Sequence, residues 1–251
     1  MKVPADWFRE WFNSPYYHKL YFERDEHEAA AFINRLLAYL QPSPGVLMLD
    51  VACGKGRHAR MLAASGFDVT GFDLAPDSIE FAKQFENERL HFYLHDMRLP
   101  FWINYFDYAF NFFTSFGYFR TEREHYNAIR TISQSLNSNG IFVLDYLNKN
   151  CAEDNLVHKS EKEIDGIRYY LTKWFDETHF YKKIIIEDEQ LKVPLEFIEK
   201  VAKFSLGDFN DMFAYNGLQV QQVFGDYQLN AFDVKKSPRL LMVAKKLHKK
   251  P

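Results

Sequence analysis

Two glycines and two aspartates stand at a spacing that suits the binding of a nucleoside-containing ligand. Gly54 and Gly56 follow a short apolar run at residues 46–51, and Asp73 stands nineteen residues after Gly54, at the end of the next apolar run. Glycines in such a turn let the backbone approach a ligand closely, and a carboxylate after the second strand can accept hydrogen bonds from both ribose hydroxyls. Asp50 precedes the turn, and its negative charge favours a ligand with a cationic amino group.

Two kinds of cofactor compete for this turn. Residues 54–59 (GKGRHA) fit the dinucleotide pattern G-x-G-x-x-G/A, with Asp73 in the position of the ribose partner. Asp50 argues against a dinucleotide, because it would stand close to the pyrophosphate and repel it. We also find no constellation of residues suited to hydride transfer. A nucleoside–amino-acid conjugate therefore fits the turn better than a nicotinamide dinucleotide.

The segments around the turn alternate between strand and helix patterns. Short apolar runs predict buried strands at residues 46–51, 67–72, 91–94, 106–113 and 141–146. Helical spacing and helix start signals predict helices at about residues 28–40, 58–65, 77–86 and 122–136, with a turn at 137–140. Strands that alternate with helices form a parallel sheet, which binds its ligands at the carboxyl ends of the strands.

The alternation ends after the fifth strand. Residues 164–175, 179–188 and 193–204 carry β-branched and aromatic side chains in rough alternation with polar ones. This pattern predicts three antiparallel strands with one covered face. A helix at 205–216 and strands at 218–224 and 239–244 are expected to close the chain.

Four motifs follow one another in the order and spacing of the class I S-adenosylmethionine-dependent methyltransferases. They are residues 49–56 (LDVACGKG), 71–74 (GFDL), 95–98 (HDMR), and 106–108 (FDY) with 111–119 (NFFTSFGYF). The chain therefore resembles this family over residues 46–147. The resemblance implies an α/β fold: a Rossmann-like, mostly parallel seven-stranded sheet with an antiparallel last strand, plus a three-stranded antiparallel insertion. It also implies S-adenosylmethionine as cofactor and S-adenosylhomocysteine as product.

The same resemblance assigns contacts to the cofactor. Asp73, with Leu74 beside it, is expected to hold the ribose, and Asp50 the methionyl amino group. Asp96 and the backbone of Met97 are expected to hold the adenine. The other implied cofactor residues are Ala52, Cys53, Gly54 and Gly56 in the turn, and Asn111 and Phe112 after the fourth strand.

Small-molecule N-methyltransferases of the amino-sugar type resemble the chain over a wider range. The shared features are a Tyr-rich N-terminal helix (16–24, YYHKLYFER), a Ser-x-Gly-aromatic segment (115–118) and an antiparallel meander (164–204). Tyr118 stands where this subgroup can have a histidine, so a histidine-based proton role does not carry over. Tyr118 itself is the catalytic candidate. The wider set of base candidates is Tyr118, Asp145, Tyr146, His18 and His27.

The N-terminal tyrosines are interpreted as part of a lid. Tyr17, Tyr21 and Arg24 are expected to close over the cofactor, with Arg24 binding its carboxylate. The alternative is an aromatic core with one solvated arginine. The predicted substrate pocket consists of Tyr16, Tyr118, Tyr146 and Arg239.

Three parts are expected along the chain. Residues 1–45 form the helical lid, residues 46–147 with 205–251 form the S-adenosylmethionine-binding domain, and residues 148–204 form the β insertion that covers the active site. No metal is expected: Asp145 and Asn148 superficially suit the ligand set of metal-dependent relatives, but no matching Asp stands at the Asn111 end of the fourth strand.

Composition limits the class of protein and of acceptor. The formal net charge of −3 and the pI near 6.3 argue against a general nucleic-acid binder. Two cysteines and the lack of an apolar run of about 20 residues predict a cytoplasmic protein without a membrane span. We expect in-line methyl transfer to the nitrogen or oxygen of a small molecule, by a monomer or homodimer with no DNA partner. The alternatives are an RNA or protein methyltransferase, and a catalytically silent binding module.

Overall fold

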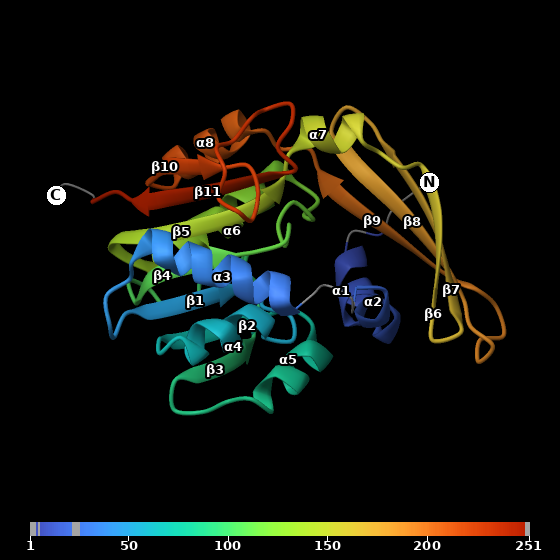
Figure 1. Ribbon diagram of the computed structural model, residues 1–251, viewed down its shortest axis with the longest axis horizontal. Coiled ribbons are helices and arrows are strands. Elements are labelled where there is room, and N and C mark those ends of the chain that lie inside the picture. The colour runs from blue at the N-terminus through green and yellow to red at the C-terminus, as the bar shows by residue number, and fades with distance from the viewer. Residues whose placement is uncertain (1–3, 5, 22–25, 249–251) are drawn as a thin grey trace.

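The computed structural model describes residue 4, residues 6–21 and residues 26–248. Its larger sheet has seven strands in the order β10-β11-β5-β4-β1-β2-β3 (Figure 1). The strands are β1 (Leu47–Val51), β2 (Asp68–Asp73), β3 (Leu90–Leu94), β4 (Phe106–Asn111), β5 (Leu136–Leu147), β10 (Leu218–Phe224) and β11 (Arg239–Lys246). β11 is antiparallel to both of its neighbours, β5 and β10, and the five strands from β5 to β3 are parallel. The predicted mostly parallel sheet with an antiparallel last strand is confirmed.

Helices cover both faces of this sheet. They are α3 (Glu26–Leu40), α4 (Arg57–Ala64) and α5 (Pro76–Lys83) on one face, and α6 (Glu122–Ser135) and α8 (Leu206–Tyr215) on the other. Met48 packs with the first group and Leu49 with the second, because successive residues of a strand point to opposite faces. The sheet is therefore buried between two apolar layers, which explains the continuous apolar runs in its central strands.

A second sheet stands beyond the carboxyl ends of the parallel strands. It consists of β6 (Lys159–Ile164), β7 (Ile167–Phe175), β8 (His179–Glu187) and β9 (Leu195–Ala202), all antiparallel. The three predicted antiparallel strands are present as β7, β8 and β9, and β6 is a fourth strand that was not predicted. β6 reads KSEKEI and is largely exposed, so it lacks the apolar alternation that reveals a strand. Such a charged edge strand discourages pairing with another chain.

Two other local predictions need correction. The expected turn at residues 137–140 lies inside β5, where Leu136 already pairs with Phe106. Asn139 has a φ of 65° there, so the turn-like sequence bends the strand without ending it. A short helix, α7 (Lys149–Asp154), follows β5 and had no expected counterpart.

Two short helices lie between the sheets (Figure 1). They are α1 (Trp7–Asn13) and α2 (Pro15–Leu20), and α1 contacts both β9 and α5. Trp11 is fully buried, with its ring centroid 4.7 Å from that of Phe197 on β9. The expected tyrosine-rich helix at 16–24 is shorter than predicted, since α2 ends at Leu20 and Tyr21 caps it. None of the helices in the described residues has the length and apolar character needed to cross a membrane.

Candidate active site

A pocket of about 1080 Å³ opens where the parallel strands end and α1 and α2 pass overhead. This volume slightly exceeds the usual range for small-molecule sites, about 300–1,000 Å³, so the pocket has room for two ligands together. The predicted site residues that line it are Asp50, Ala52, Cys53, Gly54, Asp73, Leu74, Asp96, Met97, Phe112, Tyr17, Tyr21 and Tyr118. The strand ends and the turns after them form its floor.

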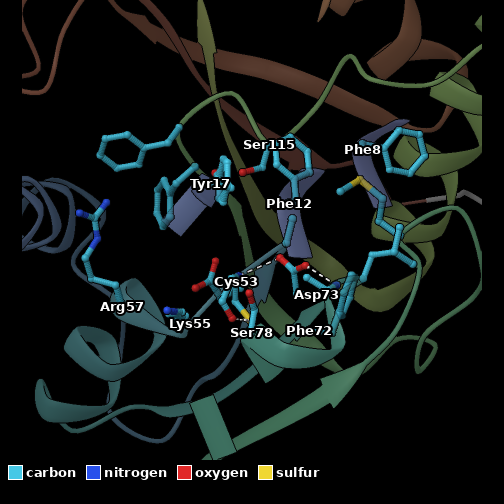
Figure 2. Close-up of a pocket in the computed structure, with 18 of the residues that line it drawn as sticks. Phe8, Phe12, Tyr17, Cys53, Lys55, Arg57, Phe72, Asp73, Ser78 and Ser115 are labelled. Carbon is cyan, nitrogen blue, oxygen red and sulfur yellow. Dashed lines mark hydrogen bonds between the residues drawn. The ribbon is translucent and has the colours of Figure 1, made fainter. Parts of the chain in front are cut away.

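Asp73 is the central carboxylate of the floor (Figure 2). Its Oδ2 accepts a hydrogen bond from the Gly54 amide at 2.8 Å, and its Oδ1 accepts from the Ala75 amide at 2.9 Å. Burial raises the pKa of this carboxyl group. Because a carboxylate offers about four acceptor positions, each oxygen keeps capacity for a further donor. Two ligand hydroxyls side by side would match this arrangement.

The two turn glycines have different roles. Gly54 has a φ of 54°, and a Cβ there would meet no atom within 4 Å, so its open side faces the pocket. Gly56 also has a positive φ, of 77°, but a Cβ there would stand 2.5 Å from the Phe92 ring. Gly56 does not line the pocket; it was predicted to contact the cofactor, and instead it permits close packing of the turn on β3.

Asp50 lies deeper in the floor and is almost completely buried. Its Oδ2 accepts from the Ala59 amide at 3.1 Å, at the start of α4. The pKa of Asp50 is raised to about 7, mainly by burial and also by the nearby Asp73 charge, while the Ala59 hydrogen bond and the Arg57 charge act in the opposite direction. A cationic ligand group beside Asp50 would favour the ionised form.

Asp96 sits at the edge of the floor in a charge cluster. It forms an ion pair with Arg98 at 2.7 Å and a longer one with Arg9 of α1 at 3.4 Å. Burial alone would raise the pKa of Asp96, but hydrogen bonds and charge from Arg98 lower it. Arg98 in turn pairs with Glu124 at 2.7 Å, which holds it in place. Asp96 is therefore an ionised acceptor at neutral pH.

Aromatic rings form the roof of the pocket. Phe8 and Phe12 come from α1, Tyr17 from α2, and Tyr21 from its cap; Phe8, Phe12 and Tyr17 are in the upper part of Figure 2. Phe8 and Phe12 were missed, although their spacing of four residues places them on one helical face. A further ring, Tyr118, stands 5.1 Å from Phe12, centroid to centroid.

Glu199 of β9 brings a carboxylate into this roof, and it too was missed. Its Oε1 accepts from the Trp11 indole at 2.7 Å and from the Tyr21 hydroxyl at 2.8 Å, and its Oε2 lies 3.1 Å from the Lys182 ammonium. Burial alone would raise the pKa of Glu199, but Lys182 and the two hydrogen bonds lower it. No sequence signal could have identified Glu199, because it stands in a strand with charged residues at several positions.

The loop after β4 (residues 112–118) supplies the wall between floor and roof. Phe112, Phe113, Ser115 and Tyr118 line the pocket from this loop. The Tyr118 hydroxyl donates to the carbonyl of Thr114, which fixes the ring against the loop. 

Several predicted residues lie away from the pocket. Asn111 is fully buried, and its amide donates to the Val51 carbonyl at 2.9 Å, so it joins β4 to β1. Tyr16 points to the second sheet and donates to Asp188 at 3.0 Å. Tyr146 is buried in the core and donates to the Ala202 carbonyl at 2.6 Å. Asn111 and Tyr146 lie away from the pocket because both faces of the sheet are covered, so a polar strand-end residue need not face a ligand. Tyr16 lies away from it because its position in α2 turns it to the second sheet.

The last predicted substrate residue, Arg239, is engaged elsewhere. It forms an ion pair with the buried Asp145 at 2.7 Å and does not line the pocket. Asp145 was a base candidate, and it is fully buried and does not line the pocket either. His18 lines the pocket, and burial lowers its pKa to about 4. Arg24 and the side chain of His27 lie outside the described residues.

Comparison with known proteins identifies the family. The methyltransferase-domain family model matches residues 21–223, so the chain belongs to this family of methyltransferases. Over 101 residues the chain is 31% identical to YqeM of Bacillus subtilis (strain 168), which is provisionally named a methyltransferase. That match spans 39% of this chain and 41% of the length of YqeM.

Two solved structures share the whole architecture. An S-adenosylmethionine-dependent methyltransferase from Clostridium acetobutylicum ATCC 824 gives a TM-score of 0.77 at 16% identity, over 93% of this chain and 96% of that one. The sugar N-methyltransferase KedS8 from Streptoalloteichus sp ATCC 53650 gives a TM-score of 0.72 at 17% identity, over 99% and 97%. At these identities the likeness establishes the fold, including the second sheet.

Proposed function

We propose that the chain transfers a methyl group from S-adenosylmethionine to the nitrogen or oxygen of a small molecule, leaving S-adenosylhomocysteine. The observation that supports this most is the joint position of Asp50, Asp73 and Asp96 in the floor of one pocket. Three carboxylates spaced along three strand ends match the amino group, the ribose and the adenine of an elongated ligand. The family membership agrees with this proposal.

The floor residues are assigned as follows in the proposal. Asp73 accepts from the ribose hydroxyls, with Leu74 beside it, and Asp50 contacts the methionyl ammonium. Asp96 accepts from the adenine amino group, and Met97 lies next to it. The residues proposed to enclose the rest of the cofactor are Ala52, Cys53, Gly54, Phe112, Tyr17 and Tyr21.

Methyl transfer requires the protein to position the acceptor and the methyl donor more than to take part in covalent chemistry. When bound, S-adenosylmethionine supplies a methyl group on a sulfonium, which is already a good leaving group. The contribution of the protein is to hold the acceptor atom in line and about 3–3.5 Å from the methyl carbon. The ring-lined roof excludes water from that approach. Tyr118 is the proposed acceptor-side residue: its hydroxyl donates to Thr114, and the oxygen lone pairs can accept from an acceptor N–H or O–H.

The roof favours a small acceptor over a macromolecular one. α1 and α2 pass between the pocket and the second sheet, and Glu199 ties them to that sheet. A cleft for RNA or a protein segment would need an open face here. We therefore propose that, of the predicted lid at residues 1–45, α1 and α2 cover the pocket, and that residues 148–204 form the cover behind them. α3 packs against the large sheet with α4, so it belongs with residues 46–147 and 205–251 in the binding domain.

Calorimetry with S-adenosylmethionine and S-adenosylhomocysteine tests whether the pocket binds this cofactor, which the proposal and both alternatives require. We expect both to bind the unmodified protein, and binding of neither would contradict the proposal. A methyl-donor consumption screen with small amines, small alcohols and bulk tRNA then separates the alternatives. Turnover with tRNA alone would favour an RNA methyltransferase, and binding without any turnover would favour a silent module.

Binding of S-adenosylhomocysteine is expected to strengthen as the pH rises from 6 to 8. The ligand ammonium favours ionised Asp50, whose pKa burial raises to about 7, so below that pH binding must first remove a proton. Calorimetry over this pH range measures the effect, which can reach tenfold per pH unit on the acidic side. In Asp50→Asn the profile is expected to flatten; an unchanged profile in that variant would contradict the role of Asp50.

The raised pKa of Asp50 has the opposite effect on the stability of the ligand-free protein, which is expected to fall as the pH rises. Between the ordinary carboxyl pKa and about 7, folded Asp50 holds a proton that the unfolded chain has released. The free energy of unfolding therefore decreases as the pH rises through this window. Denaturant titrations of the wild type and Asp50→Asn at pH 5 and pH 7 measure this contribution separately from ligand binding.

A further inference from the structure

We propose that Asp145 and Arg239 are positioning residues for methyl transfer. They form a buried ion pair outside the pocket that fixes the conformation of the loop at residues 112–118, and through this loop they set the wall of the pocket. The inference rests on the proposed function, because the loop is given a role in that reaction.

The loop at residues 112–118 has an unfavourable backbone conformation that contacts from other segments must stabilise. Phe113 and Thr114 have φ values of 55° and 60°, and Gly117 has 93°. Residues other than glycine seldom adopt this left-handed region, and a β-branched residue such as threonine does so least readily. Such a conformation persists where the surroundings determine it, and it concentrates at functional sites. Here the strained residues are neighbours of the rings of Phe112 and Tyr118, which line the pocket.

Asp145 binds both strained residues. Its side chain is fully buried, and its Oδ2 accepts from the Phe113 amide at 2.8 Å. Its backbone carbonyl accepts from the Thr114 amide at 3.0 Å. The Tyr227 hydroxyl also donates to Oδ2, at 2.9 Å, and the Tyr227 ring lies 5.1 Å from that of Phe113. One residue of β5 thus fixes two consecutive amides of the loop.

Arg239 completes the arrangement from β11. Its Nε donates to Asp145 Oδ1 at 2.8 Å, and its Nη2 donates to the Thr114 hydroxyl at 2.9 Å. The guanidinium therefore neutralises the buried carboxylate and holds the loop by a second route. A lysine is not equivalent here, because its donors all lie on one nitrogen, whereas the planar fork of arginine reaches Asp145 and Thr114 from two separate nitrogens. Removing either partner leaves the other charge buried without compensation.

Asp107 provides a matched control at the opposite end of the sheet. Its carboxylate also accepts from a backbone amide, that of Leu47 at 3.0 Å, and from a side chain, the Asn137 amide at 2.8 Å. None of these three residues lines the pocket. Both carboxylates therefore anchor a backbone amide, although Asp107 is half-buried and Asp145 is fully buried in an ion pair, and only Asp145 is connected to the wall of the pocket.

The experiment compares Asp145→Asn, Arg239→Lys and Asp107→Asn with the wild type. Calorimetry gives the Kd of S-adenosylmethionine and of S-adenosylhomocysteine, and amide hydrogen exchange follows Phe113 and Thr114. We expect Asp145→Asn to weaken S-adenosylmethionine binding about tenfold. It should weaken S-adenosylhomocysteine binding less, because the proposal places the pocket-lining rings of this loop beside the sulfonium, which only S-adenosylmethionine carries. Exchange at Phe113 and Thr114 should accelerate. Arg239→Lys should show a smaller change of the same kind.

The Asp107→Asn control separates positioning from stability. It should lower the Tm while leaving the ratio of the two Kd values within about twofold of the wild type, since no pocket residue moves. The inference is overturned if Asp145→Asn keeps the wild-type ratio, or if Asp107→Asn changes it equally. If Asp145→Asn does not fold, Tyr227→Phe replaces it in the experiment, because it removes one of the donors to Asp145 Oδ2. The ratio of the S-adenosylmethionine and S-adenosylhomocysteine Kd values then tests the inference in the same way. Failure of the proposed function would differ, because the wild type itself would then bind neither ligand.

Discussion

Asp73→Asn is expected to weaken the binding of S-adenosylmethionine by about 100-fold. The substitution removes the charge that two ribose hydroxyls would share, and each hydrogen bond to a charged group contributes about 1.5–3 kcal/mol. It also replaces an oxygen that accepts from Gly54 or Ala75 by an NH₂ group, which faces an amide donor. Isothermal calorimetry with S-adenosylmethionine and S-adenosylhomocysteine measures the loss, which should be similar for both because both carry the ribose.

Two variants make this result specific. Asp107→Asn changes a carboxylate that lies outside the pocket and should bind both ligands normally. Asp73→Glu keeps the charge but moves it by one methylene, so it should retain part of the affinity. An Asp73→Asn protein that is folded and binds S-adenosylmethionine as tightly as the wild type would exclude Asp73 from the cofactor site.

Gly117→Ala is expected to destabilise the protein by about 4 kcal/mol, which lowers the Tm by about 10 °C in a chain of this size. Two effects add. The φ of 93° is strained for any residue with a Cβ, and that Cβ would overlap the Tyr146 hydroxyl and stand 3.1 Å from its ring carbon Cζ. Tyr146 cannot easily give way, because its hydroxyl donates to the Ala202 carbonyl and the Ala202 amide donates back to Gly117.

Gly166→Ala is the matched control for this stability prediction. Gly166 has a φ of 77° in the turn between β6 and β7, but a Cβ there would meet nothing within 4 Å. It therefore carries the backbone strain without the overlap, and its Tm should fall by only about 3 °C. Thermal unfolding followed by circular dichroism compares the two. Equal losses would show that Tyr146 moves aside and that the close approach at Gly117 has little energetic weight.

The parts of the fold that could be predicted are those that depend on residues close together in the sequence. The turn with Gly54 and the strand ending at Asp73 are close neighbours in the chain, and their apolar flanks mark buried parallel strands. β6 could not be predicted, because its charged residues face solvent and its partner β7 supplies the covered face. The second sheet as a whole was visible because β7 and β8 alternate between buried and more exposed positions.

In the candidate site, too, some residues could be predicted from local sequence and others could not. The floor carboxylates follow from local motifs, whereas the roof depends on contacts between distant segments. Trp11 and Glu199 are separated by 188 positions, and Asp145 and Arg239 by 94. Nothing in either segment identifies its partner. Tyr146 and Arg239 were placed in the substrate pocket because polar groups at strand ends often face a ligand, but here the core and an ion pair engage them.

Glu199 links the segments that cover the pocket, and ligands must pass these segments to enter or leave. One carboxylate receives donors from α1, from the cap of α2 and from β8, through Trp11, Tyr21 and Lys182. These segments cannot separate one at a time without leaving a desolvated charge with fewer donors. We therefore expect the roof to open cooperatively, so that reactant loading and product departure share one concerted step, which can set the rate of turnover independently of the transfer itself.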